Sequence, residues 1–499
     1  MDNTYLIEKD FKELLKEQSA YKEVISLAHW DMRTKIPKKG VDQRSEVVGF
    51  MAEKVHQLET SEKMKYFIDV LKDQTEDDII RKTVEECEEN YERNRKIPHD
   101  EYKEYVMLQS KAEAIWQEAR EKSDFSLFQP FLEKLVEYNK KFANYWGYEK
   151  NIYDALLHNY EPGVTTETLD QVFPSVRDSL TELLGKITNS SVKPNPDVLK
   201  GHFSKAKQEA FALEVLNKMG YDFNAGRLDE TIHPFAIALN IHDVRVTTRY
   251  DEEDFRMAVF GTIHEGGHAL YEQNINPSLA NTPLATGTSM GIHESQSLFW
   301  ENFVGRSEAF WYSHYNLFKD FAPASFQAVP HGQFYKAVNE VKPSFIRIEA
   351  DELTYSLHIM VRYELEKALI NGDIKVKDLP GLWNEKMKDY LGITPPSDKQ
   401  GVLQDIHWSG GDFGYFPSYA LGYMYAAQFN HTLNKEMNVD DLIASGEFHQ
   451  IKEWFTKHVH QYGKMKKPLE ILNDVTGESL NPAYLVNYLT KKYSGIYQF

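Results

Sequence analysis

The chain has 499 residues, more than one compact core usually needs, and its 41% hydrophobic and 27% charged content is typical of a globular protein. A formal net charge of −19, with no stripe of lysine and arginine, argues against a nucleic-acid partner. No stretch contains the roughly 20 apolar residues that a membrane helix requires, so we expect no membrane-spanning segment.

The first residues and the single cysteine predict a location in the cytoplasm. The N-terminal sequence has no basic region followed by an apolar run, as a secretory signal would have. One thiol cannot form an internal disulfide, which suits a reducing compartment. Cys87 stands among glutamates, and we interpret it as a solvated residue of a helix with no functional role.

Helical periodicity dominates the first half of the chain. Apolar residues recur at helical spacing between Phe11 and Leu71, and residues 76–95, 102–121 and 128–145 show the pattern of amphipathic helices. Prolines interrupt the pattern, but no long linker, internal repeat or domain boundary is evident. We therefore predict a mainly α-helical fold in which residues 1–499 form a single unit, with two lobes around a groove.

Residues 242–250 depart from this pattern. They alternate apolar and polar side chains and are rich in β-branched residues, which predicts a strand. Helical spacing resumes from about Asp254 to Glu272. We therefore expect a small β-sheet beside the helical body. One hypothesis is that Val244 to Thr248 present a free strand edge, to which an extended peptide binds by main-chain hydrogen bonds.

The strongest functional signal is the sequence HEGGH. His264 and His268 are one helical turn apart on the same face, so both imidazoles can reach a single cation. Glu265, beside the first histidine, is placed to hold a water molecule and take its proton. Gly266 and Gly267 count against a helix, because each costs about 1 kcal/mol relative to alanine. Close approach of a neighbouring helix or of a substrate would explain them.

A carboxylate from the next helix would complete a metal site. Glu294, in the sequence HESQS, is our choice for a third ligand, giving two histidines and one glutamate with an open position. His293 and Glu301 are alternatives, but His293 would point off the helix face that Glu294 uses. A carboxylate that merely favours a helix N-terminus is the structural alternative for Glu294.

Together with further motifs in chain order, these residues resemble the M32 family of metallocarboxypeptidases. HExxH alone is shared by many unrelated peptidases, whereas the ordered set is specific. The other matching segments are residues 29–40, HPF at 233–235, DxRxT at 243–247, IRxxAD at 346–351 and GxxQDxHW at 401–408.

The resemblance implies a helical HExxH peptidase fold with a long substrate groove and a homodimer. It also implies one zinc or cobalt ion per chain and a broad preference for C-terminal residues, with C-terminal proline disfavoured.

A carboxypeptidase needs a cation that binds the terminal carboxylate of its substrate, and the planar fork of arginine suits this role. Arg347 is the first candidate, unless it forms an ion pair with an acidic neighbour such as Glu349 or Asp351. Arg245 is a second candidate, or it limits substrate length as the DxRxT loop of the resembling family implies. His233 either lines the pocket or is a local structural group.

Hydrolysis also needs a donor for the oxyanion of the tetrahedral intermediate. His407 and either Tyr423 or Tyr419 are the candidates, and by analogy with related peptidases we favour Tyr423. Each tyrosine is equally well explained as a core aromatic residue. Gln404 either orients His407 or binds the substrate backbone.

The sequence thus predicts a zinc-dependent metallocarboxypeptidase that acts on peptides, with Glu265 as general base. An endo-acting oligopeptidase would use the same metal site but would not need a carboxylate anchor. A non-catalytic binding protein is a third hypothesis, although it would not need both the metal ligands and the base.

Overall fold

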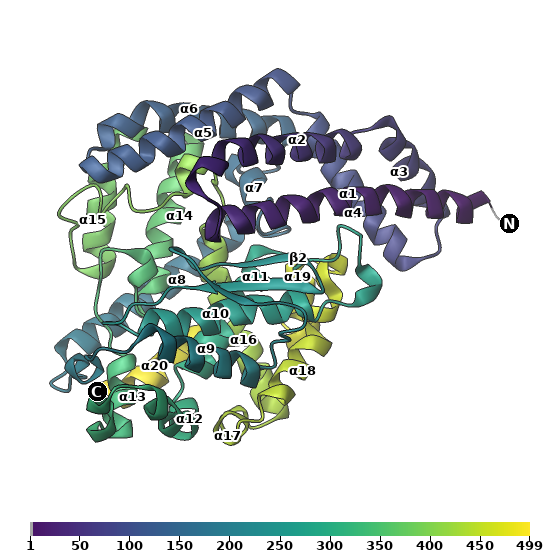
Figure 1. The fold of residues 1–499 in the computed structure, drawn as a ribbon. Helices are drawn as coiled ribbons and strands as arrows, with labels where there is room; N and C mark the ends of the chain where they lie inside the picture. Colours follow the sequence, from purple (N-terminus) through teal and green to yellow (C-terminus); the bar gives the residue numbers. More distant parts are fainter. Residues whose placement is uncertain (1–2) are drawn as a thin grey trace.

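The computed structural model describes residues 3–499, and helices make up most of the protein (Figure 1). The helices before the sheet are α1 (Asn3–Thr34), α2 (Val41–Glu59), α3 (Glu62–Gln74), α4 (Asp78–Arg95), α5 (His99–Lys122), α6 (Phe125–Trp146), α7 (Ile152–Leu157), α8 (Thr166–Asn189) and α9 (Lys205–Met219). The predicted helices at 76–95, 102–121 and 128–145 correspond to α4, α5 and α6 and are confirmed.

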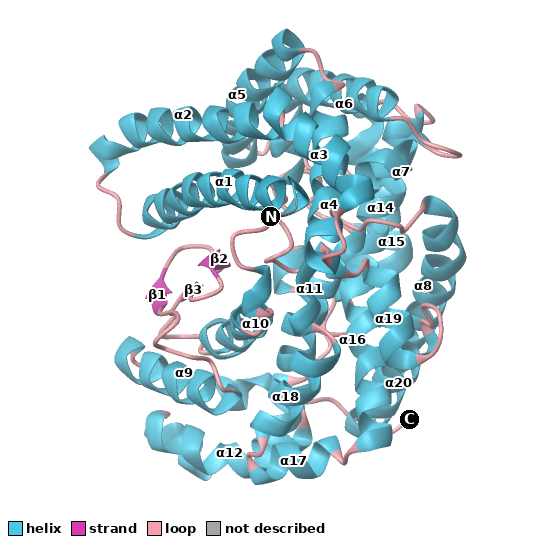
Figure 2. Cartoon of the chain, turned by 90° about the vertical axis from the view of Figure 1, so that its right-hand side faces the viewer, coloured by secondary structure: helices cyan, strands magenta, loops and turns pink. Residues whose placement is uncertain are grey.

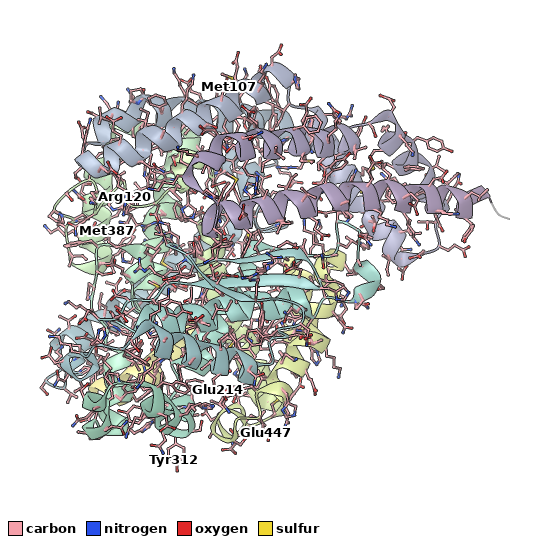
Figure 3. The ribbon with its side chains drawn as sticks, viewed as in Figure 1. Met107, Arg120, Glu214, Tyr312, Met387 and Glu447 are labelled. Carbon is pink, nitrogen blue, oxygen red and sulfur yellow. The ribbon has the colours of Figure 1, made fainter. Side chains whose placement is uncertain are left out.

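The second half of the chain supplies most of the remaining helices. They are α10 (Arg256–Gln273), α11 (Met290–Leu298), α12 (Glu308–Phe321), α13 (His331–Val338), α14 (Tyr355–Asn371), α15 (Leu379–Leu391), α16 (Pro417–Glu436), α17 (Val439–Ser445), α18 (Phe448–His458), α19 (Pro468–Thr476) and α20 (Ala483–Tyr497). Met107 on α5 and Tyr312 on α12, both largely exposed, lie on opposite outer edges of the molecule (Figure 3).

A three-stranded sheet lies between α1 and α10 (Figure 1). Its strands are β1 (Leu228–Glu230), β2 (Ala236–Asn240) and β3 (Asp243–Thr248), in the order β1-β3-β2. The strand predicted at 242–250 is therefore confirmed as β3. However, β3 pairs in parallel with β1 and antiparallel with β2, so it is the central strand. The predicted free edge at Val244 to Thr248 is wrong, because both edges of this strand are already occupied.

Two hydrophobic clusters form the core. The large one extends from α5 to α20 and includes Val244 and Val246, the inward side chains of β3. The smaller one joins the start of α1 to α3 and α4. Cys87 belongs to this smaller cluster and is 7% exposed, so the interpretation as a solvated cysteine is wrong. Burial raises the pKa of its thiol to about 12, which keeps the thiol protonated.

The predicted helical fold with a small sheet beside α10 is confirmed. Among the helices of residues 3–499, none is both long enough and apolar enough to cross a membrane. The groove and the single-unit organisation remain predictions.

Candidate metal centre and substrate site

The candidate metal centre is built on two adjacent helices. His264 and His268 project from α10, and Glu294 projects from α11. One ligand atom from each of these residues lies within 4.8 Å of the others. The Nε2 atoms of His264 and His268 are 3.7 and 3.4 Å from Oε2 of Glu294. The residues that the sequence singled out as metal ligands are thus brought together. Figure 2 shows α10 and α11 with α16 beside them.

Close packing explains the two glycines within the HEGGH helix. A Cβ atom on Gly267 would lie 2.6 Å from the carbonyl oxygen of Gln296 and 2.7 Å from Cα of Ser297, both on α11. A Cβ atom on Gly266 would lie 2.7 Å from Leu216 on α9. The helices therefore approach each other more closely than a larger residue permits, which brings Glu294 within reach of the two histidines.

His268 is oriented by a chain of hydrogen bonds. Its Nδ1 is 2.6 Å from Nδ1 of His293, and Nε2 of His293 is 2.8 Å from Oε1 of Glu272. The carboxylate of Glu272 can only accept, so His293 donates through Nε2 and accepts from His268 through Nδ1. This arrangement leaves the Nε2 lone pair of His268 free for a cation. His293, an alternative ligand in the sequence analysis, thus contacts a ligand and is not one of the three grouped residues.

His264 is oriented by a carboxylate. Its Nδ1 donates to Oε2 of Glu301 at 2.9 Å, and Arg306 donates to the other oxygen of Glu301 at 3.0 Å. Glu301 lies in a π-helical turn, η4 (Phe299–Gly305), which directly follows α11. Such wide turns are often found at functional sites. Glu301, the other alternative ligand, therefore also supports a ligand.

The electrostatics of the three residues suit a cation. Burial lowers the pKa of His268 to about 4, so its imidazole is neutral. Burial also opposes charge on His264, but the carboxylates of Glu294 and Glu301 outweigh it and raise the pKa to about 10. The same negative field that retains a proton on His264 would attract a divalent cation. Two imidazoles and one carboxylate are the donor set of hydrolytic zinc sites, so the residues fit such an ion.

Glu265 lies beside this centre. Its side chain is 8% exposed, and burial raises its pKa to about 7. A carboxyl group with a pKa near the operating pH is well suited to take up and release a proton. The geometry is therefore compatible with the role that the sequence analysis gave to Glu265.

A second polar cluster surrounds Arg347. Nε of Arg347 donates to Oδ1 of Asp405 at 2.9 Å, and its guanidinium lies over the ring of Tyr419, 4.7 Å from the ring centre. Arg347 thus pairs with a residue far along the chain and not with its acidic neighbours Glu349 or Asp351. Within residues 3–499, nothing accepts a hydrogen bond from its two terminal nitrogens, so both are free to bind a ligand.

Gln404 and His407 belong to the same cluster. Oε1 of Gln404 accepts a bond from the main-chain N–H of Arg347 at 2.8 Å, and its Nε2 donates to the carbonyl of Phe345 at 2.9 Å. Gln404 therefore holds the Arg347 segment. Nε2 of His407 is 3.1 Å from the hydroxyl of Tyr419, and burial lowers the pKa of His407 to about 3, so the ring is neutral.

Tyr423 does not face the metal ligands. Its side chain is fully buried, and its hydroxyl donates to Oε1 of Glu352 at 2.7 Å. The favoured oxyanion donor of the sequence analysis is thus occupied elsewhere. The hydroxyl of Tyr355 is instead 3.5 Å from Oε1 of Glu294, and the residue is partly exposed. Sequence reasoning missed Tyr355, because nothing in the local pattern distinguishes it from other helical tyrosines.

Two further candidates lie on the sheet. Arg245 on β3 makes two hydrogen bonds to Asp243 at 2.7 and 2.8 Å and covers the ring of Trp30 on α1, 4.5 Å from its centre. His233 is exposed in the loop between β1 and β2. Within residues 3–499, neither residue forms a hydrogen bond or ion pair with His264, His268 or Glu294.

Replacing His293 with alanine should weaken metal binding by about 10- to 100-fold, because Nδ1–H of His268 loses its acceptor. Competition with a coloured chelator measures the change. Replacing Glu272 with glutamine is the matched control, since the amide oxygen can still accept from His293. Equal affinities in the wild type and in H293A would contradict the orienting role.

Comparisons with known proteins extend over nearly the whole chain. A family model described as Carboxypeptidase Taq (M32) metallopeptidase matches residues 10–493. The chain is 54% identical over 493 residues to carboxypeptidase 1 of Bacillus subtilis, covering 98% of each chain. It is 40% identical over 491 residues to thermostable carboxypeptidase 1 of Thermus thermophilus, covering 95% of each.

The structure is also similar to solved structures. It matches the crystal structure of an M32 carboxypeptidase from Deinococcus radiodurans R1 with a TM-score of 0.96 and 33% sequence identity, covering 99% of this chain and 100% of that one. The similarity thus includes the whole arrangement of helices and not the HEGGH segment alone.

Proposed function

Because this chain belongs to the M32 family of metallocarboxypeptidases, we propose that it is a zinc enzyme that removes single amino acids from the C-terminal ends of peptides. The observation that supports the metal requirement is the group formed by His264, His268 and Glu294. These three side chains would hold the ion. Bound there, a divalent cation supplies Lewis acidity, which lowers the pKa of water and polarises a carbonyl group.

Glu265 acts as the general base in this proposal. Its carboxylate takes the proton of the water that attacks the last peptide carbonyl and passes it to the departing amine. The pKa of about 7 that burial gives this side chain suits both steps near neutral pH. The water-poor surroundings strengthen its interaction with the attacking water.

The developing oxyanion needs a hydrogen-bond donor. Tyr423 is engaged with Glu352, so we assign this role to a hydroxyl that faces the ligands. Tyr355, near Glu294, is the first choice, and Tyr419 with His407 is the second.

The terminal carboxylate of the peptide binds the free nitrogens of Arg347. This cation is held by Asp405 and Gln404, and it is only 7% exposed, so water competes little for it.

Replacing Arg347 with methionine should raise KM for a free-acid peptide by about 10- to 100-fold, which corresponds to 1.5–3 kcal/mol for a hydrogen bond to a charged group. Steady-state kinetics on a free-acid peptide and its amide measure the effect, and an unchanged KM would exclude Arg347 as the anchor.

Digestion of one N-blocked peptide, with a free or an amidated C-terminus, tests the activity. A ladder that loses single C-terminal residues, only from the free acid and only without chelator, is expected. Internal cuts in both peptides would instead indicate an endo-acting oligopeptidase. Absence of cleavage with added zinc or cobalt would favour a binding protein.

The remaining features also belong to this proposal. They are a homodimer in the cytoplasm, cobalt as a substitute metal, broad specificity with C-terminal proline disfavoured, and substrate contacts from Arg245 and His233. Arg245 is supported by its place on β3 beside α10, where it and Trp30 form a stacked pair.

A further inference from the structure

One buried carboxylate serves two arginines in the substrate site. Oδ1 of Asp405 accepts from Nε of Arg347 at 2.9 Å, and its Oδ2 accepts from Nε of Arg362 at 2.7 Å. Nη2 of Arg362 lies 2.6 Å from the same Oδ2 atom. The side chains of Arg347, Asp405 and Arg362 are 8%, 10% and 0% exposed. The three charges therefore form one desolvated cluster.

Arg362 cannot touch a substrate. It lies on α14 with no exposed surface, its Nη1 donates to the carbonyl of His358 at 2.7 Å, and its guanidinium lies over the ring of Trp383, 4.6 Å from the centre. The ring of Phe416 lies close to both guanidinium groups, 5.8 Å from that of Arg347 and 5.4 Å from that of Arg362. These contacts fix the position of Arg362 on the buried side of Asp405, next to Arg347, the residue that we assign to the C-terminal carboxylate of the substrate.

The charge balance of the cluster is informative. Two arginines and one aspartate carry a net charge of +1, and no other carboxylate within residues 3–499 pairs with either arginine. The neighbouring imidazoles of His358 and His407 add no charge, because burial lowers the pKa of both. Burying a charge without a counter-charge is costly, so the ligand that this cluster binds most favourably is a group that carries one negative charge.

We propose that Arg362 is a specificity-determining residue. Its buried positive charge balances the negative charge of Asp405, which leaves the charge of Arg347 without a counter-charge until the C-terminal carboxylate of a peptide binds. The inference rests on the proposed carboxypeptidase function. Without Arg362, Asp405 would neutralise Arg347, and an incoming carboxylate would leave the cluster with excess negative charge. With Arg362, the carboxylate completes a set of two positive and two negative charges, whereas an amidated C-terminus does not.

Kinetics on one N-blocked peptide, as free acid and as amide, test this role. Replacing Arg362 with glutamine removes the charge and should raise KM for the free acid at least about tenfold, the factor that 1.4 kcal/mol produces, while kcat changes little. Replacing it with lysine keeps the charge and should preserve most of the affinity. Arg177→Gln on α8 is the control: it removes an arginine that pairs with Glu364 on α14 and with Asp178, not with Asp405, so it should leave KM unchanged.

A double variant separates charge from position. R362Q combined with D405N restores the net charge of +1, and the asparagine oxygen can still accept from Arg347. Its KM for the free acid should therefore fall back towards the wild-type value. In the double variant Arg347 is the one remaining charge of the cluster, just as its charge is the unbalanced one in the wild type, so the KM of this variant can be compared with that of the wild type even if R362Q alone does not fold. Circular dichroism and thermal unfolding check each variant.

The outcomes distinguish the two proposals. Equal cleavage of acid and amide by the wild type would overturn the carboxypeptidase function and this inference with it. If Arg347→Met weakens free-acid binding but R362Q resembles the Arg177→Gln control, only the inference fails. A double variant with a higher KM than R362Q would also overturn it, because position and not charge would then determine affinity.

Discussion

Replacement of Glu265 with glutamine should lower kcat by about 10³-fold, within the range usual for a general acid or base, and leave the metal in place. Glutamine keeps the size of the side chain but cannot take a proton from water. The ligands His264, His268 and Glu294 are untouched, and the bonds that orient them come from other residues. Single-turnover kinetics and metal analysis of the same preparation measure the two quantities.

Two other outcomes of the Glu265→Gln experiment would not support the assignment of the base. If the variant contains a full equivalent of metal and cleaves at the wild-type rate, another group is the base. A variant without metal would show that Glu265 supports the ligands, and its loss of activity would then say nothing about proton transfer. Glu272→Gln, which changes a buried glutamate on the same helix, shows how much any such substitution disturbs the site.

Replacement of Gly267 with alanine should destabilise the protein by about 1–3 kcal/mol, the usual cost of overpacking, and weaken metal binding. The new methyl group would lie 2.6 and 2.7 Å from main-chain atoms of α11, which cannot rotate away as a side chain can. The two helices must therefore separate, and Glu294 moves with α11. Thermal unfolding, with and without metal, reports both effects.

Gly261 is the matched control because it lies on the same helix in open surroundings. Its nearest neighbour would be Sδ of Met257 at 3.8 Å, an ordinary contact. Gly261→Ala should therefore be neutral or stabilise the helix by up to about 1 kcal/mol. If both alanine variants behave alike, the close approach of α10 and α11 does not constrain the site.

The sequence was most informative where the chemistry is local. Two histidines four residues apart need only a helix to share a cation, and the alternation in β3 needs only a strand. Glu294 was identified because it belongs to a recognisable motif, HESQS, in the next α-helix along the chain. These features depend on neighbours within a few turns, which periodicity records.

The parts of the fold and of the site that the sequence did not predict depend on contacts between segments far apart in the chain. Arg347 pairs with Asp405, 58 positions away, although acidic residues stand beside it in the sequence. Tyr423 lies on a helix with both an active-site face and a core face, and no pattern in the sequence indicated which face it occupies. The short strands β1 and β2 carry too few residues for a clear alternation.

The separate hydrophobic cluster of α1, α3 and α4 has a consequence for unfolding. Its buried apolar side chains pack against one another and form a cluster separate from the large core. The free energy of unfolding of this part can therefore differ from that of the large core. On heating, this part is expected to melt as a cooperative unit of its own, giving a calorimetric trace with two transitions. A metal ion bound between α10 and α11 would then shift the transition of the large core and leave the other where it was.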